Sequence, residues 1–271
     1  MTRRKAALTA ALLTGVLLSA QGNPPAAQAP PAGPATGPLA ALAPRAAVQA
    51  IVIDPGHGGD DAGVTSQEGV VEKDLTLQVA RRVKALIETR LGIRVLLTRE
   101  DDRDLGPDER AAIANNSKAD LFISLHFNGG LTEATNGAEV YYLGLDREGQ
   151  EALKATASDS LALPVIGGGT RPVDLVRWDM AQARFIPAST ELARILEEAL
   201  RARVPMGPRP LQAAPMRVLV GVNMPAALIE LAYLTNLDQS QAAASETFQA
   251  SVTQAIYDSV LRFRDYVEGP R

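Results

Sequence analysis

The alternation of short apolar runs with amphipathic segments is the feature that most constrains the fold of this chain. Strands alternating with helices predict an α/β fold: a single domain with a mostly parallel central sheet, flanked by helices on both faces. The runs predicted to be buried strands are residues 50–53, 94–98, 120–126, 138–144, 216–221 and 226–233. The segments predicted to be helices are residues 72–92, 108–119, 189–204 and 247–267.

Two of these helices carry recognisable end signals. Residues 72–92 place Leu75, Val79 and Val83 near one face and end at Gly92, a residue that commonly stops a helix. The helix over 189–204 is predicted to begin with Ser189 as its N-cap, because a serine oxygen can accept from free amides of the first turn.

The first 47 residues are predicted to lie outside this domain. Arg3, Arg4 and Lys5 precede an apolar run over residues 6–20, a pattern typical of a signal peptide and short for a membrane span. Residues 1–20 are therefore predicted to be a signal peptide, with an uncleaved helical anchor as the alternative. Residues 21–47, rich in Pro, Ala and Gly, are predicted to be a disordered linker, so the domain covers 48–268.

Composition limits where the protein works and what it binds. The chain has no cysteine, which excludes disulfides and a lipid-modified cysteine anchor. Its net charge of −4 gives no basic field for nucleic acid. We therefore expect an exported protein of the periplasm, cell envelope or extracellular space, without nucleic acid and without stable membrane insertion after signal cleavage.

The two histidines of the chain occupy equivalent places. His57 follows the strand over 50–53 in the turn DPGHGG, and His126 ends the strand over 120–126 before another pair of glycines. In proteins with an open α/β sheet, ligands bind at the carboxyl ends of the strands. The sequence therefore predicts that both histidines belong to one metal or catalytic site.

A hydrolytic zinc site needs about three protein ligands and an open position for water. Because the chain has only two histidines and no cysteine, the third ligand would be a carboxylate. Glu72 is favoured, since it opens the helix that follows the DPGHGG turn, although a carboxylate there could equally serve the helix dipole. The carboxylates that follow the first strand are Asp54, Asp60, Asp61, Glu68 and Glu72.

Glu230 stands inside the apolar run AALIELAY. A carboxylate there costs several kcal/mol to bury unless it is paired or hydrated. One interpretation is a desolvated group with a raised pKa, suited to general acid–base work. The other is a strand-end glutamate that forms an ion pair with an arginine such as Arg99 or Arg110.

Five blocks of the chain resemble, in order, those of zinc-dependent N-acetylmuramoyl-L-alanine amidases of the amidase_3 type, a peptidoglycan amidase family. The resemblance extends from residue 50 to 265. The chain departs from the family pattern at Phe127–Asn128 and at Ala232–Tyr233, neither of which replaces a ligand. The blocks are IVIDPGHGGDDAG, VVEKDLTLQVARRV, LLTREDDRDL with ERAAIANNSKADLFISLHFNGG, GAEVYYLG and AALIELAYLTNLDQ.

The resemblance implies one Zn²⁺ per domain, held by His57, Glu72 and His126, with Glu230 as the catalytic residue. It implies hydrolysis of the amide between N-acetylmuramic acid and L-alanine in peptidoglycan, during wall remodelling or daughter-cell separation. Substrate-binding candidates are Asn128, Arg99 and Arg110; for the two arginines, a structural ion-pair role is the alternative.

Residues 145–186 form a longer stretch than the minimal family domain needs. We interpret this insertion either as a surface elaboration or as a segment that covers the cleft or recruits an activator protein. Two other functions compete with the amidase: another zinc hydrolase of wall material, such as a peptidase or deacetylase, and a non-catalytic wall-binding module.

Overall fold

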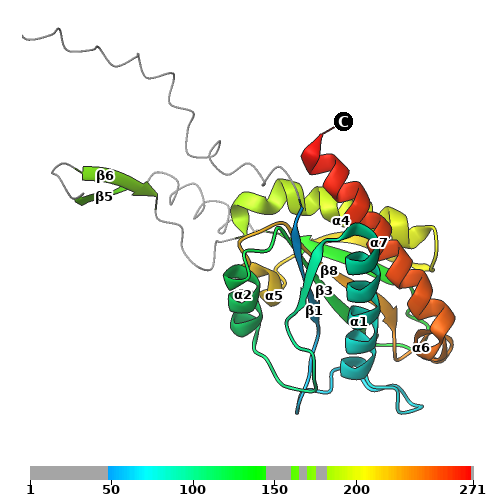
Figure 1. The fold of residues 1–271 in the computed structure, drawn as a ribbon. Helices are drawn as coiled ribbons and strands as arrows, with labels where there is room; N and C mark the ends of the chain where they lie inside the picture. The colour runs from blue at the N-terminus through cyan, green and yellow to red at the C-terminus, as the bar shows by residue number, and fades with distance from the viewer. Residues whose placement is uncertain (1–47, 145–159, 165–169, 175–181, 270–271) are drawn as a thin grey trace, which may run out of the picture. The chain divides into compact units, whose positions relative to one another are not determined.

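The structure of the chain is a computed structural model that describes residues 48–144, 160–164, 170–174 and 182–269 (Figure 1). The predicted signal peptide, the predicted linker and most of the 145–186 insertion lie outside the described residues. Within the described ranges, no helix combines the length and the apolar character needed to cross a membrane.

The described residues contain a six-stranded sheet of order β2-β1-β3-β8-β4-β7. All neighbouring pairs run parallel except β4 and β8, which are antiparallel, so the predicted mostly parallel sheet is confirmed. The strands are β1 (Ala50–Pro55), β2 (Arg94–Leu97), β3 (Leu121–Asn128), β4 (Ala138–Leu143), β7 (Met206–Ala214) and β8 (Ala226–Tyr233).

Helices cover both faces of the sheet, as predicted (Figure 1). One face packs against α1 (Glu72–Leu91), α4 (Ile186–Arg201) and α7 (Glu246–Glu268), and the other against α2 (Pro107–Asn116) and α5 (Arg217–Val220). Successive strand residues point to opposite faces, so Ile51 and Ile53 enter the first core while Val52 enters the second. The short helix α6 (Leu237–Ala244) packs against α7 and β8.

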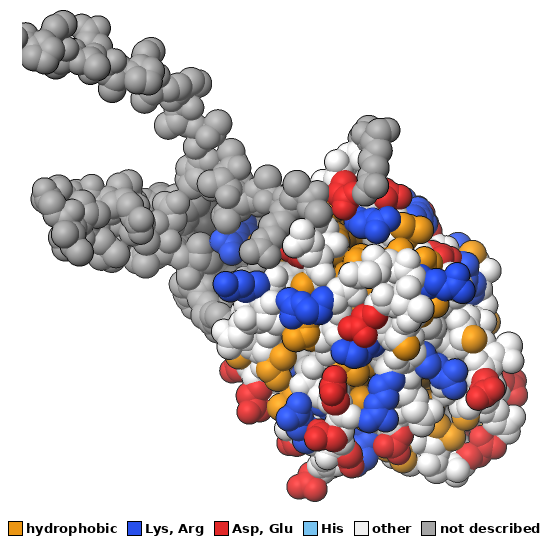
Figure 2. Space-filling view, in the orientation of Figure 1, with side chains coloured by type: hydrophobic (Ala, Val, Ile, Leu, Met, Phe, Trp, Pro, Cys, Tyr) orange, Lys and Arg blue, Asp and Glu red, His pale blue; other side chains and the backbone are white. Residues whose placement is uncertain are grey.

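Of the insertion, the structure describes the antiparallel pair β5 (Ser160–Pro164) and β6 (Thr170–Asp174), and near its end the 3-10 turn Ala183–Phe185. On the face of the domain seen in Figure 2, acidic and basic side chains are interspersed, which agrees with the small net charge.

Several sequence expectations about the helices and strands were wrong or incomplete. Residues 216–221 were expected to be a strand, but Arg217–Val220 form the single helical turn α5; a short apolar run cannot distinguish a buried strand from a buried helix. Strand β7 was missed because Pro208 and Pro210 argue against a central strand, and here they lie on an edge strand, where proline is tolerated. Helix α6 was also missed.

Ser189 is not the N-cap of α4, which begins three residues earlier at Ile186. The Ser189 side chain is buried and joins two elements instead: its hydroxyl donates to Gln182 Oε1 (2.7 Å) and accepts from the amide of Ala226 at the start of β8 (3.0 Å). At the other predicted signal, Gly92 does stop α1, in the left-handed conformation (φ 65°).

Candidate metal centre

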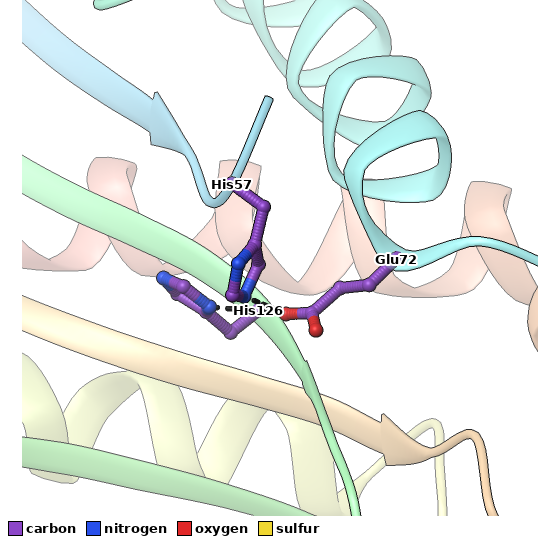
Figure 3. A group of neighbouring side chains, drawn as sticks. All are labelled: His57, Glu72 and His126. Carbon is purple, nitrogen blue, oxygen red and sulfur yellow. Dashed lines mark hydrogen bonds and ion pairs between the residues drawn. The ribbon is translucent and has the colours of Figure 1, made fainter. Parts of the chain in front are cut away.

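Three side chains from distant parts of the sequence converge at one edge of the sheet (Figure 3). His57 Nε2 and His126 Nδ1 each lie 3.0 Å from the same carboxylate oxygen, Glu72 Oε1. The two imidazole rings meet edge to face, with their centroids 4.9 Å apart. His57 comes from the turn after β1, Glu72 from the first residue of α1, and His126 from the end of β3.

The turn after β1 places the His57 side chain at the carboxyl ends of the strands. His57 has a positive φ of 59°, which is uncommon for a residue with a side chain, and Gly58 and Gly59 continue the left-handed path (φ 135° and 60°). Two backbone hydrogen bonds between Gly58 and Asp61 (2.8 and 3.1 Å) close the turn. The glycines therefore let the chain reverse immediately after the strand and leave the imidazole at its rim.

Glu72 is buried, with 1% of its surface exposed, and both carboxylate oxygens are hydrogen-bonded. Oε1 accepts from the amide of Phe127 (3.0 Å) and Oε2 from the amide of Val64 (2.8 Å). Burial by itself would raise the pKa of Glu72, but hydrogen bonds from His126 and His57 outweigh it and lower the pKa to about 2. The carboxylate is therefore ionised, as a metal ligand must be.

Burial also acts on His57, where by itself it would lower the pKa. Hydrogen bonds to Glu72 and Asp61, together with their negative charges, outweigh burial and raise the pKa of His57 to about 9. The site thus favours a positive charge at the point where the three side chains meet.

The donor set fits a cation of the size of zinc. Two imidazole nitrogens and one carboxylate oxygen are a ligand set of hydrolytic zinc sites. Ligands bonded tetrahedrally at about 2.0–2.1 Å are about 3.3 Å apart, and here the nitrogen–oxygen separations are 3.0 Å. All three ligand atoms lie within 4.8 Å of one another. His57, Glu72 and His126 can therefore hold a metal ion.

Glu230 lies beside this group. In the pairing of β3 with β8, Glu230 is directly opposite His126, so both side chains are on the same face of the sheet. Its Oε2 is buried and has no hydrogen-bond partner among the described residues. Burial raises the pKa of Glu230 to about 7. Among the described residues, Glu230 forms no ion pair with Arg99, Arg110 or any other arginine, so the structure does not support that alternative.

Arg99 and Arg110 are buried beneath the turn, with 1% and 5% of their surfaces exposed. Arg110 Nη1 donates to Asp54 Oδ1 and to the carbonyl of Pro55, both at 2.7 Å. Arg99 Nη2 donates to the carbonyl of Gly56 (2.9 Å). Their donors are used inside the protein, so the prediction that they bind substrate is replaced by the structural alternative: they hold the turn that carries His57.

Asn128 ends β3, where its backbone carbonyl accepts from the amide of Leu234 (2.9 Å). No side-chain hydrogen bond of Asn128 is described, and its role in substrate binding stays a prediction.

The sequence did not predict the positions of two acidic residues beside the site. Asp61 contacts His57 rather than joining the ligands, and Glu139, buried on β4, lies opposite Glu230. An acidic residue inside the apolar run AEVYYL was the available signal for Glu139.

The other candidate carboxylates have partners outside the site or are exposed. Asp54 pairs with Arg110 and accepts from Ser124, and Glu68 accepts from Gln241. Asp60 is exposed.

The ring of His126 rests against the backbone of Gly56. A Cβ built on Gly56 would lie 2.6 Å from His126 Nδ1, far inside van der Waals contact. We therefore expect Gly56→Ala to displace the ring and to weaken metal binding about tenfold or more. Zinc affinity measured by chelator competition checks this. Gly106→Ala is the matched control, because its Cβ would meet only Glu109 Oε2, at 3.6 Å; equal affinities for both variants would contradict the expectation.

Comparison with known proteins identifies the family of this chain. The family profile described as N-acetylmuramoyl-L-alanine amidase (Amidase_3) matches residues 51–262. The Escherichia coli N-acetylmuramoyl-L-alanine amidase AmiC is 32% identical over 233 residues, which cover 84% of this chain and 55% of that protein. The chain spans about half the length of the curated relatives it matches first.

Solved structures show the same fold. The crystal structure of an N-acetylmuramoyl-L-alanine amidase from Clostridium difficile 630 has a TM-score of 0.62 at 27% identity, covering 80% of this chain and 97% of that one. The CwlD amidase of Clostridioides difficile, solved in complex with the GerS lipoprotein, has a TM-score of 0.61 at 24% identity, covering 79% and 98%. Since the family profile spans most of the described domain, the chain belongs to the Amidase_3 family of N-acetylmuramoyl-L-alanine amidases.

Proposed function

We propose that this chain is a zinc-dependent hydrolase that cleaves the amide between N-acetylmuramic acid and the L-alanine of peptidoglycan stems. The observation that carries the proposal is the convergence of His57, Glu72 and His126 on one point, with Glu230 beside them, in a chain of this family. Two imidazoles and one carboxylate suit zinc among the common divalent ions.

His57, Glu72 and His126 would hold the ion. When bound, the ion would polarise the amide carbonyl and make a water molecule more acidic. Glu230 is the proton carrier: its carboxylate accepts a proton from the attacking water and returns one to the nitrogen of the departing alanine. This leaves a free carboxyl on the muramic acid side and a free amine on the stem peptide. The buried, unpartnered Oε2 of Glu230 is available for that work.

The rest of the chain fits an exported enzyme. Residues 1–20 are proposed as a signal peptide, 21–47 as a linker and 48–268 as the catalytic domain, working in the periplasm or cell envelope on wall remodelling or daughter-cell separation. An activator protein acting through residues 145–186 belongs to the same proposal. The CwlD amidase, a relative in fold, was solved with a lipoprotein partner.

Mass spectrometry of purified peptidoglycan incubated with the chain tests the function. We expect free stem peptides that begin at L-alanine, their loss to background on chelation, and their return when zinc is added. The other hydrolases would give different products: cleavage within the stem marks a peptidase, and release of acetate marks a deacetylase. Binding to peptidoglycan without any product would mean a wall-binding module.

A further inference from the structure

Asp61 is not one of the three candidate metal ligands, but it makes the shortest described polar contact with one of their side chains. Its Oδ2 lies 2.7 Å from Nδ1 of His57, on the side of the ring opposite to Glu72. Each imidazole has only two nitrogens. With Nδ1 held by Asp61, Nε2 is the nitrogen left to face the ion.

The turn orients the Asp61 carboxylate before it meets the histidine. Asp61 Oδ1 accepts from the amide of Gly63 (3.1 Å), and the backbone of Asp61 exchanges two hydrogen bonds with Gly58. The carboxylate is thus fixed at both ends, to the turn through one oxygen and to the imidazole through the other.

The two histidines are held in different ways. His126 faces Glu72 through Nδ1, and its ring is fixed by close packing on the backbone of Gly56. His57 sits in a left-handed turn with 23% of its side chain exposed, and its ring also lies against a glycine: a Cβ built on Gly63 would lie 2.7 Å from His57 Cδ2. What distinguishes His57 is the contact of its second ring nitrogen, Nδ1, with the Asp61 carboxylate, because no hydrogen bond of the second ring nitrogen of His126 is described.

Stability does not explain the contact. The Asp61 side chain is 54% exposed, and ion pairs at such exposed positions contribute about 0–1 kcal/mol. A carboxylate that receives the second N–H of a metal-binding histidine sets both the tautomer and the orientation of the ring.

We propose that Asp61 is a positioning residue of the metal centre, which keeps the proton of His57 on Nδ1 and turns Nε2 toward the shared ion. The inference rests on the proposed function, because it needs a metal at His57, Glu72 and His126. Asp61 itself touches neither the ion nor the substrate.

The test compares Asp61→Ala with Asp60→Ala in the full chain. Asp60 is the neighbouring residue, is exposed, and makes no hydrogen bond or ion pair with any described residue, so both variants remove one negative charge from the same turn. Zinc dissociation constants come from competition with a chromogenic chelator. We expect Asp61→Ala to bind zinc about 10–100-fold more weakly than the unmodified chain, and Asp60→Ala to stay within about twofold of it.

A second measurement separates positioning from a structural role. In the zinc-loaded chain, the Nδ1–H proton of His57 should give a strongly downfield NMR signal, which Asp61→Ala removes and Asp60→Ala keeps. Asp61→Asn retains an oxygen acceptor without the charge, so its zinc affinity should fall between the two. Circular dichroism and thermal unfolding of the metal-free variants check that each still folds.

Two results would overturn the inference, and they are distinguishable. If Asp61→Ala is folded, binds zinc as tightly as the unmodified chain and keeps the downfield signal, Asp61 does not position His57. If the unmodified chain is folded but binds no zinc, the metal centre of the proposed function fails, and the role of Asp61 fails with it.

Discussion

Replacing Glu230 by glutamine is expected to lower the turnover number by about 10²–10⁴-fold, the range that a positioned general acid–base group contributes. Glutamine keeps the size of the side chain but cannot accept and return a proton. Zinc should stay bound at the level of the unmodified chain, because the converging atoms belong to His57, Glu72 and His126. The Michaelis constant should change little.

The measurement combines stem-peptide release from peptidoglycan with the zinc content of the same sample. Glu68→Gln is the control: it makes the same chemical change in a carboxylate that accepts from Gln241 and lies outside the site. Near-normal hydrolysis by a zinc-loaded Glu230→Gln variant would remove Glu230 from the mechanism. Loss of zinc together with activity would instead make Glu230 a ligand.

Replacing Glu72 by glutamine is expected to abolish both metal binding and turnover. Glu72 Oε1 faces three nitrogens, those of His57, His126 and the Phe127 amide, while Oε2 faces the amide of Val64. A glutamine amide would turn its NH₂ toward one of these donors, so a buried donor is left unpaired at a cost of about 1–3 kcal/mol. The loss of zinc affinity should exceed about a hundredfold, the upper end of what changes outside the ligand set cause.

Asp74→Asn is the matched control for Glu72, because Asp74 is exposed and also lies in the first turn of α1. If Glu72 served only the helix dipole, both variants would lose about 0.3–1 kcal/mol of stability and neither would lose zinc. Zinc per chain by atomic absorption, with thermal unfolding of both variants, decides between the two roles. Full zinc occupancy in Glu72→Gln would contradict its place among the ligands.

The candidate site could be predicted from the sequence because most of its residues lie at the ends of predicted strands and helices. His57 and His126 follow apolar strands, Glu72 opens a helix, and Glu230 interrupts an apolar run. Parallel strands bring their carboxyl ends to one edge of a sheet, so local pattern alone predicted that the histidines lie together. The structure brings all four side chains to that edge.

The sequence could not settle which charged groups serve the site and which support it. Five carboxylates follow the first strand, and only burial and hydrogen bonding separate Glu72 from Asp61 and Asp54. In the same way, Arg110 is recognised as structural only once its guanidinium is found against the buried Asp54. These outcomes depend on contacts between segments about 50 residues apart, which no local pattern encodes.

The sequence by itself determined the α/β class, the order of most elements and the residue types available for a metal, because hydrophobic periodicity and glycine stops act locally. Only the tertiary structure decided that β4 and β7 run opposite to the other strands, and that Glu230 pairs opposite His126. It also decided which ring nitrogen of each histidine faces Glu72. The physical reason is that register and ring orientation are fixed by packing and hydrogen bonds between distant segments, and these exist only after the chain has folded.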